Sequence, residues 1–100
     1  MFVQKTDYVY ILSDYEEDGA ENVTATLDRH ALMSMVENNW PVHGEDEIVR
    51  DIISRCVNEA KVGLAEILAK TDEELSGKRS GWDCQSGWGG IQLHVVKLVR

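Results

Sequence analysis

The feature that most constrains the fold is a long amphipathic pattern over residues 46–70. Apolar side chains recur there every three or four positions, the spacing that places them on one face of a helix. Glu45, Asp46 and Glu47 stand at its start, where carboxylates stabilise the positive end of a helix. Such a helix needs an apolar surface to pack on, which the rest of the chain must supply. The stripe comprises Ile48, Val49, Ile52, Ile53, Cys56, Val57, Ala60, Leu64, Ile67 and Leu68.

Three segments have the composition of β-strands. Residues 8–15 are aromatic and β-branched, with apolar side chains at both odd and even positions, which predicts a strand covered on both faces. Residues 22–27 alternate apolar residues with threonine, as a half-exposed edge strand does. The pair Asp18-Gly19 between them favours a tight hairpin turn. Residues 91–99 predict a further strand near the C-terminus.

Shorter helical signals flank the long helix. Asp28 is placed to cap a helix over residues 29–39, which Pro41 ends. The long helix is expected to end near Lys70. Thr71 and Glu74 then form a capping-box pattern for a short extra turn, which Gly77 ends. Residues 76–90 contain five glycines and are predicted to be a loop.

The order of elements is therefore β-β-α-α-β. It predicts an α+β fold with a three-stranded, mainly antiparallel sheet and two helices on one face. The simplest arrangement places the first strand in the middle. A chain of 100 residues suits a single domain covering residues 1–100.

The negative charge is unevenly distributed. The chain has 18 acidic and 10 basic residues, a formal net charge of −8, and the first fifty residues hold 11 of the acids and three of the bases. A negative field disfavours direct binding to nucleic acid or to a membrane surface, and it favours basic partners, including proteins whose natural ligand is DNA or RNA. The alternative is that the acidity only keeps a small protein in solution.

Targeting and redox signals are sparse. No apolar stretch is long enough to cross a membrane, and the first residues lack the parts of a signal peptide, so a cytoplasmic location is expected. Cys56 and Cys84 are too few for a disulfide framework and are expected to be free thiols.

Two regions are candidate partner-binding surfaces. The first is an acidic hairpin, with Glu45, Asp46 and Glu47 as a second acidic group; such carboxylates can imitate phosphates toward a basic cleft. The second is the glycine-rich segment with Trp82 and Trp88, because tryptophan is a common interface anchor. Ordinary solvated turns and a covered core edge are the structural alternatives. The hairpin acids are Asp14, Glu16, Glu17, Asp18 and Glu21.

No pattern for catalysis, cofactor binding or metal binding is found. The hairpin matches the first positions of a calcium loop but has Ala25 where the bidentate glutamate is required. The sequence therefore predicts a non-enzymatic binding module that occludes a basic, nucleic-acid-binding surface of another protein. In size and charge alone, the chain resembles phage-encoded inhibitors of host defence, anti-CRISPR proteins included. The alternatives are a small thiol-dependent enzyme centred on Cys84 and His94, and a homodimer that pairs edge strands or buries the tryptophans.

Overall fold

The computed structural model describes residues 7–16, 19–40, 46–83 and 90–99. Four strands form one antiparallel sheet: β1 (Asp7–Glu16), β2 (Gly19–Thr26), β3 (Arg79–Asp83) and β4 (Gly90–Leu98). Their order in the sheet is β2-β1-β4-β3. The predicted α+β class and the central position of the first strand are confirmed, whereas the predicted number of three strands is wrong.

The additional strand, β3, lies inside the segment predicted to be a loop. Its residues pair with β4 from Arg79 opposite His94 to Asp83 opposite Gly90. Glycine and serine have low intrinsic strand propensity, but pairing with an existing strand outweighs a propensity that spans only about 1 kcal/mol. Composition alone could not reveal this partner, because β4 pairs with the segment only in the folded sheet.

The helices follow the predicted boundaries closely. A 3-10 turn, η1 (Arg29–Ala31), leads into α1 (Leu32–Asn39), and α2 (Glu47–Ile67) is followed by the single turn α3 (Asp72–Leu75). The Asp28 carboxylate accepts from the His30 N–H, so the predicted cap initiates η1 rather than an α-helix. Both hydrogen bonds of the capping box between Thr71 and Glu74 are present.

Gly77 ends the short helical turn, as predicted. Its φ angle of 78° lies in the left-handed region that favours glycine. Its N–H donates to the Val95 carbonyl at 2.9 Å, which ties the end of α3 to β4.

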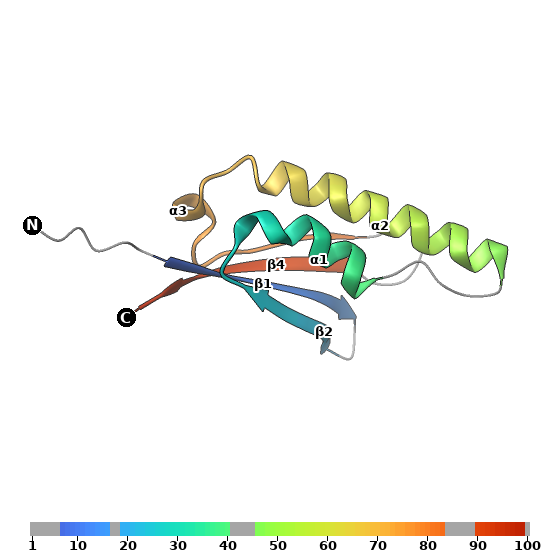
Figure 1. The fold of residues 1–100 in the computed structure, drawn as a ribbon, viewed down its shortest axis with the longest axis horizontal. Coiled ribbons are helices and arrows are strands. Elements are labelled where there is room, and N and C mark those ends of the chain that lie inside the picture. Colours follow the sequence, from blue (N-terminus) through green and yellow to red (C-terminus); the bar gives the residue numbers. More distant parts are fainter. Residues whose placement is uncertain (1–6, 17–18, 41–45, 84–89, 100) are drawn as a thin grey trace, which may run out of the picture.

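The helices all lie on one face of the sheet (Figure 1). Buried side chains alternate along the central strands, with Tyr10 and Leu12 from β1 and Leu93 and Val95 from β4 facing the helices. The core also contains Leu32, Val36, Val57, Ala60, Leu64, Leu75 and Ile91. Within the described part of the chain, no helix or strand covers the other face, where Val9 and Ile11 are half-buried and Ser13 is buried. The second cover expected over β1 is therefore not found among the described elements.

The long helix extends past the core at its N-terminal end (Figure 1). Its buried residues are Val57, Ala60 and Leu64, all in the second half. Ile48 is 71% exposed and Val49 is 39% exposed, although both belong to the predicted apolar stripe. The periodicity is real, but no described helix or strand lies beneath the first turn.

Candidate partner-binding surface

The acidic hairpin forms where it was predicted. β1 and β2 pair antiparallel, and Asp14 lies opposite Glu21 while Glu16 lies opposite Gly19. These positions bring acidic residues from both strands to one end of the sheet. Glu17 and Asp18 lie outside the described residues.

Asp14 is oriented toward the helical layer. Its Oδ2 accepts a hydrogen bond from Trp40 Nε1 at 3.3 Å, and the contact is partly buried. Trp40 is the C-cap residue of α1. Asp14 therefore joins the base of the hairpin to the end of α1, and it contributes less to an exposed acidic surface than its position in the sequence suggests.

The second acidic group lies at the start of α2. Asp46 is the N-cap, with its Oδ1 accepting from the Ile48 N–H at 2.8 Å, and Glu47 is the first helical residue. Both side chains are exposed. Asp46 thus has a local structural role, which Glu47 does not share. Glu45 lies outside the described residues.

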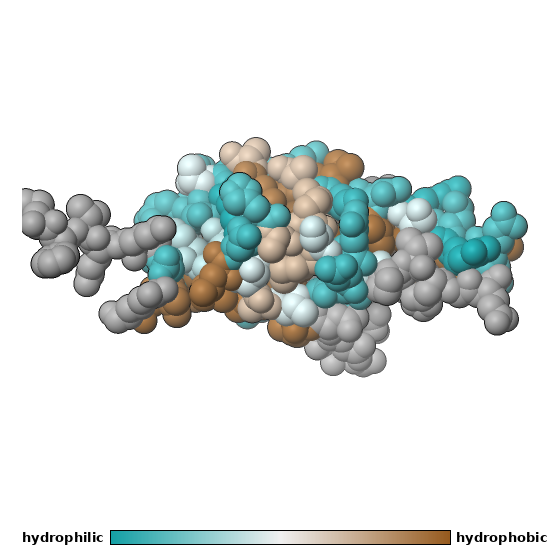
Figure 2. Space-filling model, in the orientation of Figure 1, coloured by the Kyte–Doolittle hydropathy of each residue, from teal (hydrophilic) through white to brown (hydrophobic). Residues whose placement is uncertain are grey.

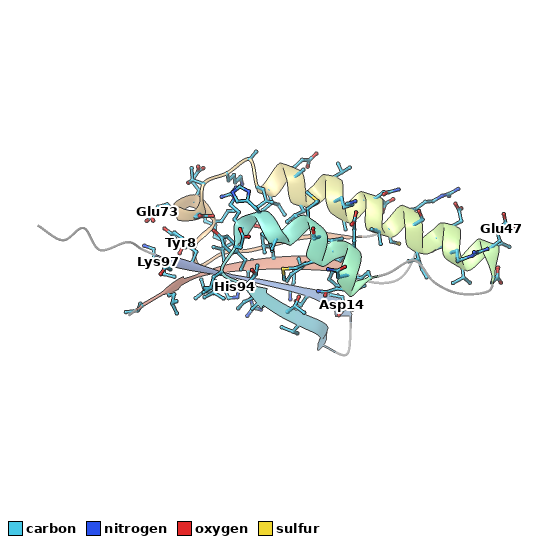
Figure 3. All side chains as sticks on the ribbon, in the orientation of Figure 1. Tyr8, Asp14, Glu47, Glu73, His94 and Lys97 are labelled. Atoms are coloured by element: carbon cyan, nitrogen blue, oxygen red, sulfur yellow. The ribbon has the colours of Figure 1, made fainter. Side chains whose placement is uncertain are left out.

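The two acidic groups lie toward the same end of the molecule. Figure 3 shows Glu47 at the tip of α2, on the far right of the view, and Asp14 well to its left, near the end of α1 where the hairpin turns. We call Asp14, Glu16, Glu21, Asp46 and Glu47 the acidic end. The start of α2, on the right of the view, presents a mainly hydrophilic surface in Figure 2.

The opposite end of the molecule, around α3, is held together by its charged groups. Arg29 Nη1 contacts Asp72 Oδ1 at 2.7 Å. The same guanidinium donates to the carbonyl oxygens of Leu68 and Lys70, just after α2. One side chain from the start of the helical layer thereby fixes the turn between α2 and α3.

A second group of contacts joins α3 to the sheet. The Tyr8 hydroxyl donates to Glu73 Oε2 at 2.6 Å, and Lys97 Nζ lies 3.3 Å from Glu73 Oε1. The three side chains lie together in Figure 3. We call Tyr8, Arg29, Asp72, Glu73 and Lys97 the α3 network.

These contacts shift several pKa values. The hydrogen bond to Glu73 raises the pKa of Tyr8 to about 12, and the same bond, with help from Lys97, lowers the pKa of Glu73. Burial, followed by a hydrogen bond to Asp72, raises the pKa of Tyr10. Hydrogen bonds from Thr71 lower the pKa of Glu74. Each shift stabilises the protonation state that holds the fold together at neutral pH.

Bases from the C-terminal half form ion pairs on α2, one of them near its start. Lys61 pairs with Glu37 and Arg55 pairs with Asp51 at 3.0 Å. Within the described residues, Glu47 takes part in no ion pair. The negative potential at the first turn of α2 is therefore not cancelled by a described base in contact with Glu47.

The remaining predicted interface residues are not tested by the described side chains. The Trp82 backbone pairs with Ile91 as part of β3, and Trp88 lies outside the described residues. The sequence suggested that Trp82 lies in an open loop, but its backbone belongs to a strand.

The cysteine prediction needs correction. Cys56, on α2, is disulfide-bonded rather than a free thiol. The chain contains one other cysteine, Cys84, which lies outside the described residues. Spacing in the sequence could not reveal this bond, because a disulfide depends on which residues the folded chain brings together. His94, the other residue of the thiol hypothesis, lies on β4 opposite Ile11.

Among the described residues, no three His, Cys, Asp or Glu side chains come together in a way that could hold a metal ion. None of the helices in the same residues is long and apolar enough to span a bilayer.

Comparison with protein-family models, with curated proteins and with solved structures finds no match to this chain.

Sequence reasoning missed the apolar component of the acidic end. Ile48 and Val49 are exposed beside Glu47 and the exposed Asp51. Their position at the start of a long helix was the available signal. The ends of such a helix lie farthest from the middle of the sheet on which it packs, so apolar residues there can stay exposed. Carboxylates beside exposed apolar side chains can provide both steering and contact area.

Proposed function

We propose that this protein is a non-enzymatic binding module whose acidic end occludes a basic, normally nucleic-acid-binding surface of a partner protein. The partner is recognised by charge, and association is steered by the field of the acidic half of the chain. The outcome is inhibition of nucleic-acid binding by the partner.

One observation supports the proposal above the others. The start of α2 projects past the core and carries exposed Asp46 and Glu47 together with exposed Ile48, whereas Asp51, in the second turn, pairs with Arg55. Ile48 is 71% exposed and Val49 beside it is 39% exposed, so the helix start offers apolar contact area next to its carboxylates. Charged residues around an apolar contact are the arrangement of a protein interface.

The division of charged groups between the two ends is consistent with this proposal. The carboxylates of Asp72 and Glu73 in the α3 network form the hydrogen bonds and ion pairs that hold α3 in place. Glu47 has no comparable contact with a described base. A carboxylate that does not hold the fold is available for a partner.

The test is affinity capture from cell lysate with the purified protein as bait, at low and at high salt. Captured proteins should be nucleic-acid-binding proteins, and added duplex DNA or RNA should release them by competition. Because the contact is electrostatic, capture should weaken as salt increases. Proteins retained equally at both salt concentrations, and unaffected by nucleic acid, would contradict the proposal.

A matched pair of variants separates recognition from net charge. Glu47→Lys and Glu66→Lys change the same residue type on exposed positions of α2 and alter the net charge equally, but Glu66 lies near the other end of the helix. Glu47→Lys should reduce capture strongly, and Glu66→Lys should not. Equal losses would mean that total charge, rather than the acidic end, controls binding.

A hairpin variant examines the other acidic group. Reversal of Glu16, Glu17 and Asp18 to lysine should also reduce capture, with a smaller salt dependence in what remains. Far-ultraviolet circular dichroism of each variant confirms that the fold is retained. Unchanged capture by this variant would remove the hairpin from the proposed surface.

A further inference from the structure

The sheet has one face that no described helix or strand covers. Tyr10 and Leu12 are buried beneath the helices, so the intervening positions of β1 point to the opposite side. Asn39 of α1 donates to Thr24 Oγ1 at 2.6 Å, which places Thr24 on the helical side and its neighbours on the other. We call this second side the open face. Its apolar members are Val9, Ile11, Val23, Ala25, Val96 and Leu98.

These side chains form a continuous patch. Val9 lies directly opposite Val96, and Ile11 lies directly opposite Ala25. Val23 is 56% exposed and follows Ala25 along the edge strand. Figure 2 shows apolar surface at the lower left of the view, over the part of the molecule where β1 begins and β4 ends. Apolar patches spread over neighbouring strands mark interaction sites more often than isolated exposed residues do.

Charge distinguishes the open face from the rest of the molecule. The chain carries −8, so two copies repel each other over most of their surface. On the open face, the strand alternation places Asp7 at one corner and Arg79 and His94 at the other side. Asp7 and Arg79 are opposite in sign, so a second copy meets charges of both signs among the described side chains of this face.

The dimensions of the sheet suit a small interface. β1 and β4 pair over nine residues, which gives a length of about 30 Å, and four strands give a width of roughly 19 Å. A face of this size covers roughly 500 Å² on each copy, so two copies would bury about 1,000 Å² in total, near the lower limit for a specific interface.

We propose that the open face binds the open face of a second copy, forming a weak symmetric dimer in which two sheets pack against each other. Such a contact uses the same patch on both copies, as two-fold symmetry requires. It leaves the acidic end of each copy outside the interface, so the dimer can present two acidic ends. The proposal does not depend on the identity of any other partner.

The dimer has a characteristic response to salt. Screening weakens the repulsion between two acidic copies, whereas apolar contact is not reduced by it. Dimerisation should therefore strengthen as salt increases, the opposite of the response expected for capture of a basic partner. The two proposals can thus fail independently.

The test is sedimentation velocity of the full chain from micromolar to near-millimolar concentration, at low and at high salt. The weight-average sedimentation coefficient should rise with concentration, and more steeply at high salt. Val23→Lys should raise the dissociation constant about tenfold or more, because a charge would be buried at the interface. A protein that remains monomeric at every concentration and salt level would overturn the proposal.

Val62→Lys is the matched control. Val62 lies on α2, on the helical side of the sheet, and is 62% exposed compared with 56% for Val23. The two variants therefore change the same residue type at similar exposure, and only Val23→Lys should weaken the dimer. Equal effects would also overturn the proposal.

A measurement on the unaltered protein covers the case in which Val23→Lys fails to fold. Amide chemical shifts recorded by NMR at low and high protein concentration should change at Val9, Ala25 and Val96 and stay constant at Val62 and Leu64. Changes confined to the helices would place the contact elsewhere and contradict the assignment to the open face.

Discussion

The α3 network and the acidic end use charged residues in opposite ways. In the α3 network, Arg29 pairs with Asp72 and donates to two backbone carbonyls. Glu73 accepts a hydrogen bond from Tyr8 and forms an ion pair with Lys97. At the acidic end, Glu47 is exposed on a projecting turn, with no described base in contact. The comparison teaches that the same residue types stabilise the fold where their partners are near and remain available for recognition where they are not.

The largest expected effect on stability is loss of the disulfide at Cys56. A disulfide of this kind stabilises a small protein by about 2–4 kcal/mol, chiefly by restricting the unfolded chain. Reduction should lower the midpoint of chemical denaturation accordingly. Cys56→Ser should match the reduced protein and should not respond to reductant, and a reductant response in that variant would contradict the assignment.

Breaking the α3 network at Arg29 should have the next largest effect. Arg29→Ala leaves Asp72 and two backbone carbonyls without their donor in a partly buried site, at a cost of about 2–3 kcal/mol. Urea denaturation measures the loss. Arg55→Ala is the control, because its exposed pair with Asp51 contributes at most about 0.5 kcal/mol. Similar losses in the two variants would show that the network has no special role.

Trp40→Phe examines the one described link between the helical layer and an acidic-end carboxylate. It keeps an aromatic ring but removes the hydrogen bond to Asp14, which should cost about 1 kcal/mol. Thermal denaturation compares the variant with the unaltered protein. An unchanged midpoint would mean that the hydrogen bond from Trp40 to Asp14 contributes nothing measurable to stability.

The α3 network should also give a specific response to pH. The pKa of Tyr8 is raised to about 12, above its ordinary value of 10.0. The stability that comes from its neutral form is complete below pH 10 and is lost as the pH rises toward about 12. Tyr8→Phe should remove this part of the alkaline loss, leaving the part due to Tyr10. Alkaline denaturation curves that coincide for the two proteins would contradict the assignment.

At acid pH the same variant should act through Glu73. Because the pKa of Glu73 is lowered from 4.5, its contribution is present above that value and is lost as the pH falls below it. Tyr8→Phe removes the largest cause of the lowering, so the variant should depend less on pH in the acid range. Glu74, whose pKa is lowered by Thr71, should still contribute.

Much of the fold could be predicted because local sequence signals specify the same helix ends and turns that the tertiary structure contains. The cap at Asp28, the capping box from Thr71 to Glu74 and the hairpin between β1 and β2 all form within a few residues of their signals. The strand β3 could not be predicted, since its glycine and serine form a strand only by pairing with β4. Local composition contains no information about a partner in another part of the chain.

The candidate site was predictable in its charge and less so in its shape. The sequence placed acidic residues on a hairpin and before α2, and the structure places both toward one end. It could not indicate that Asp14 bonds to Trp40, or that Ile48 remains exposed. Both outcomes depend on where the helical layer ends above the sheet. The disulfide at Cys56 was missed for a similar reason, because it depends on the folded path of the chain.

The most direct test of the contrast between the two regions is to measure binding and stability together in Glu47→Lys, with a partner purified after affinity capture. The account predicts affinity for that partner reduced about tenfold, while the free energy of unfolding changes by at most about 1 kcal/mol, the usual size of a helix-terminus charge effect. Undiminished affinity, or a fall in stability as large as that of Arg29→Ala, would contradict it.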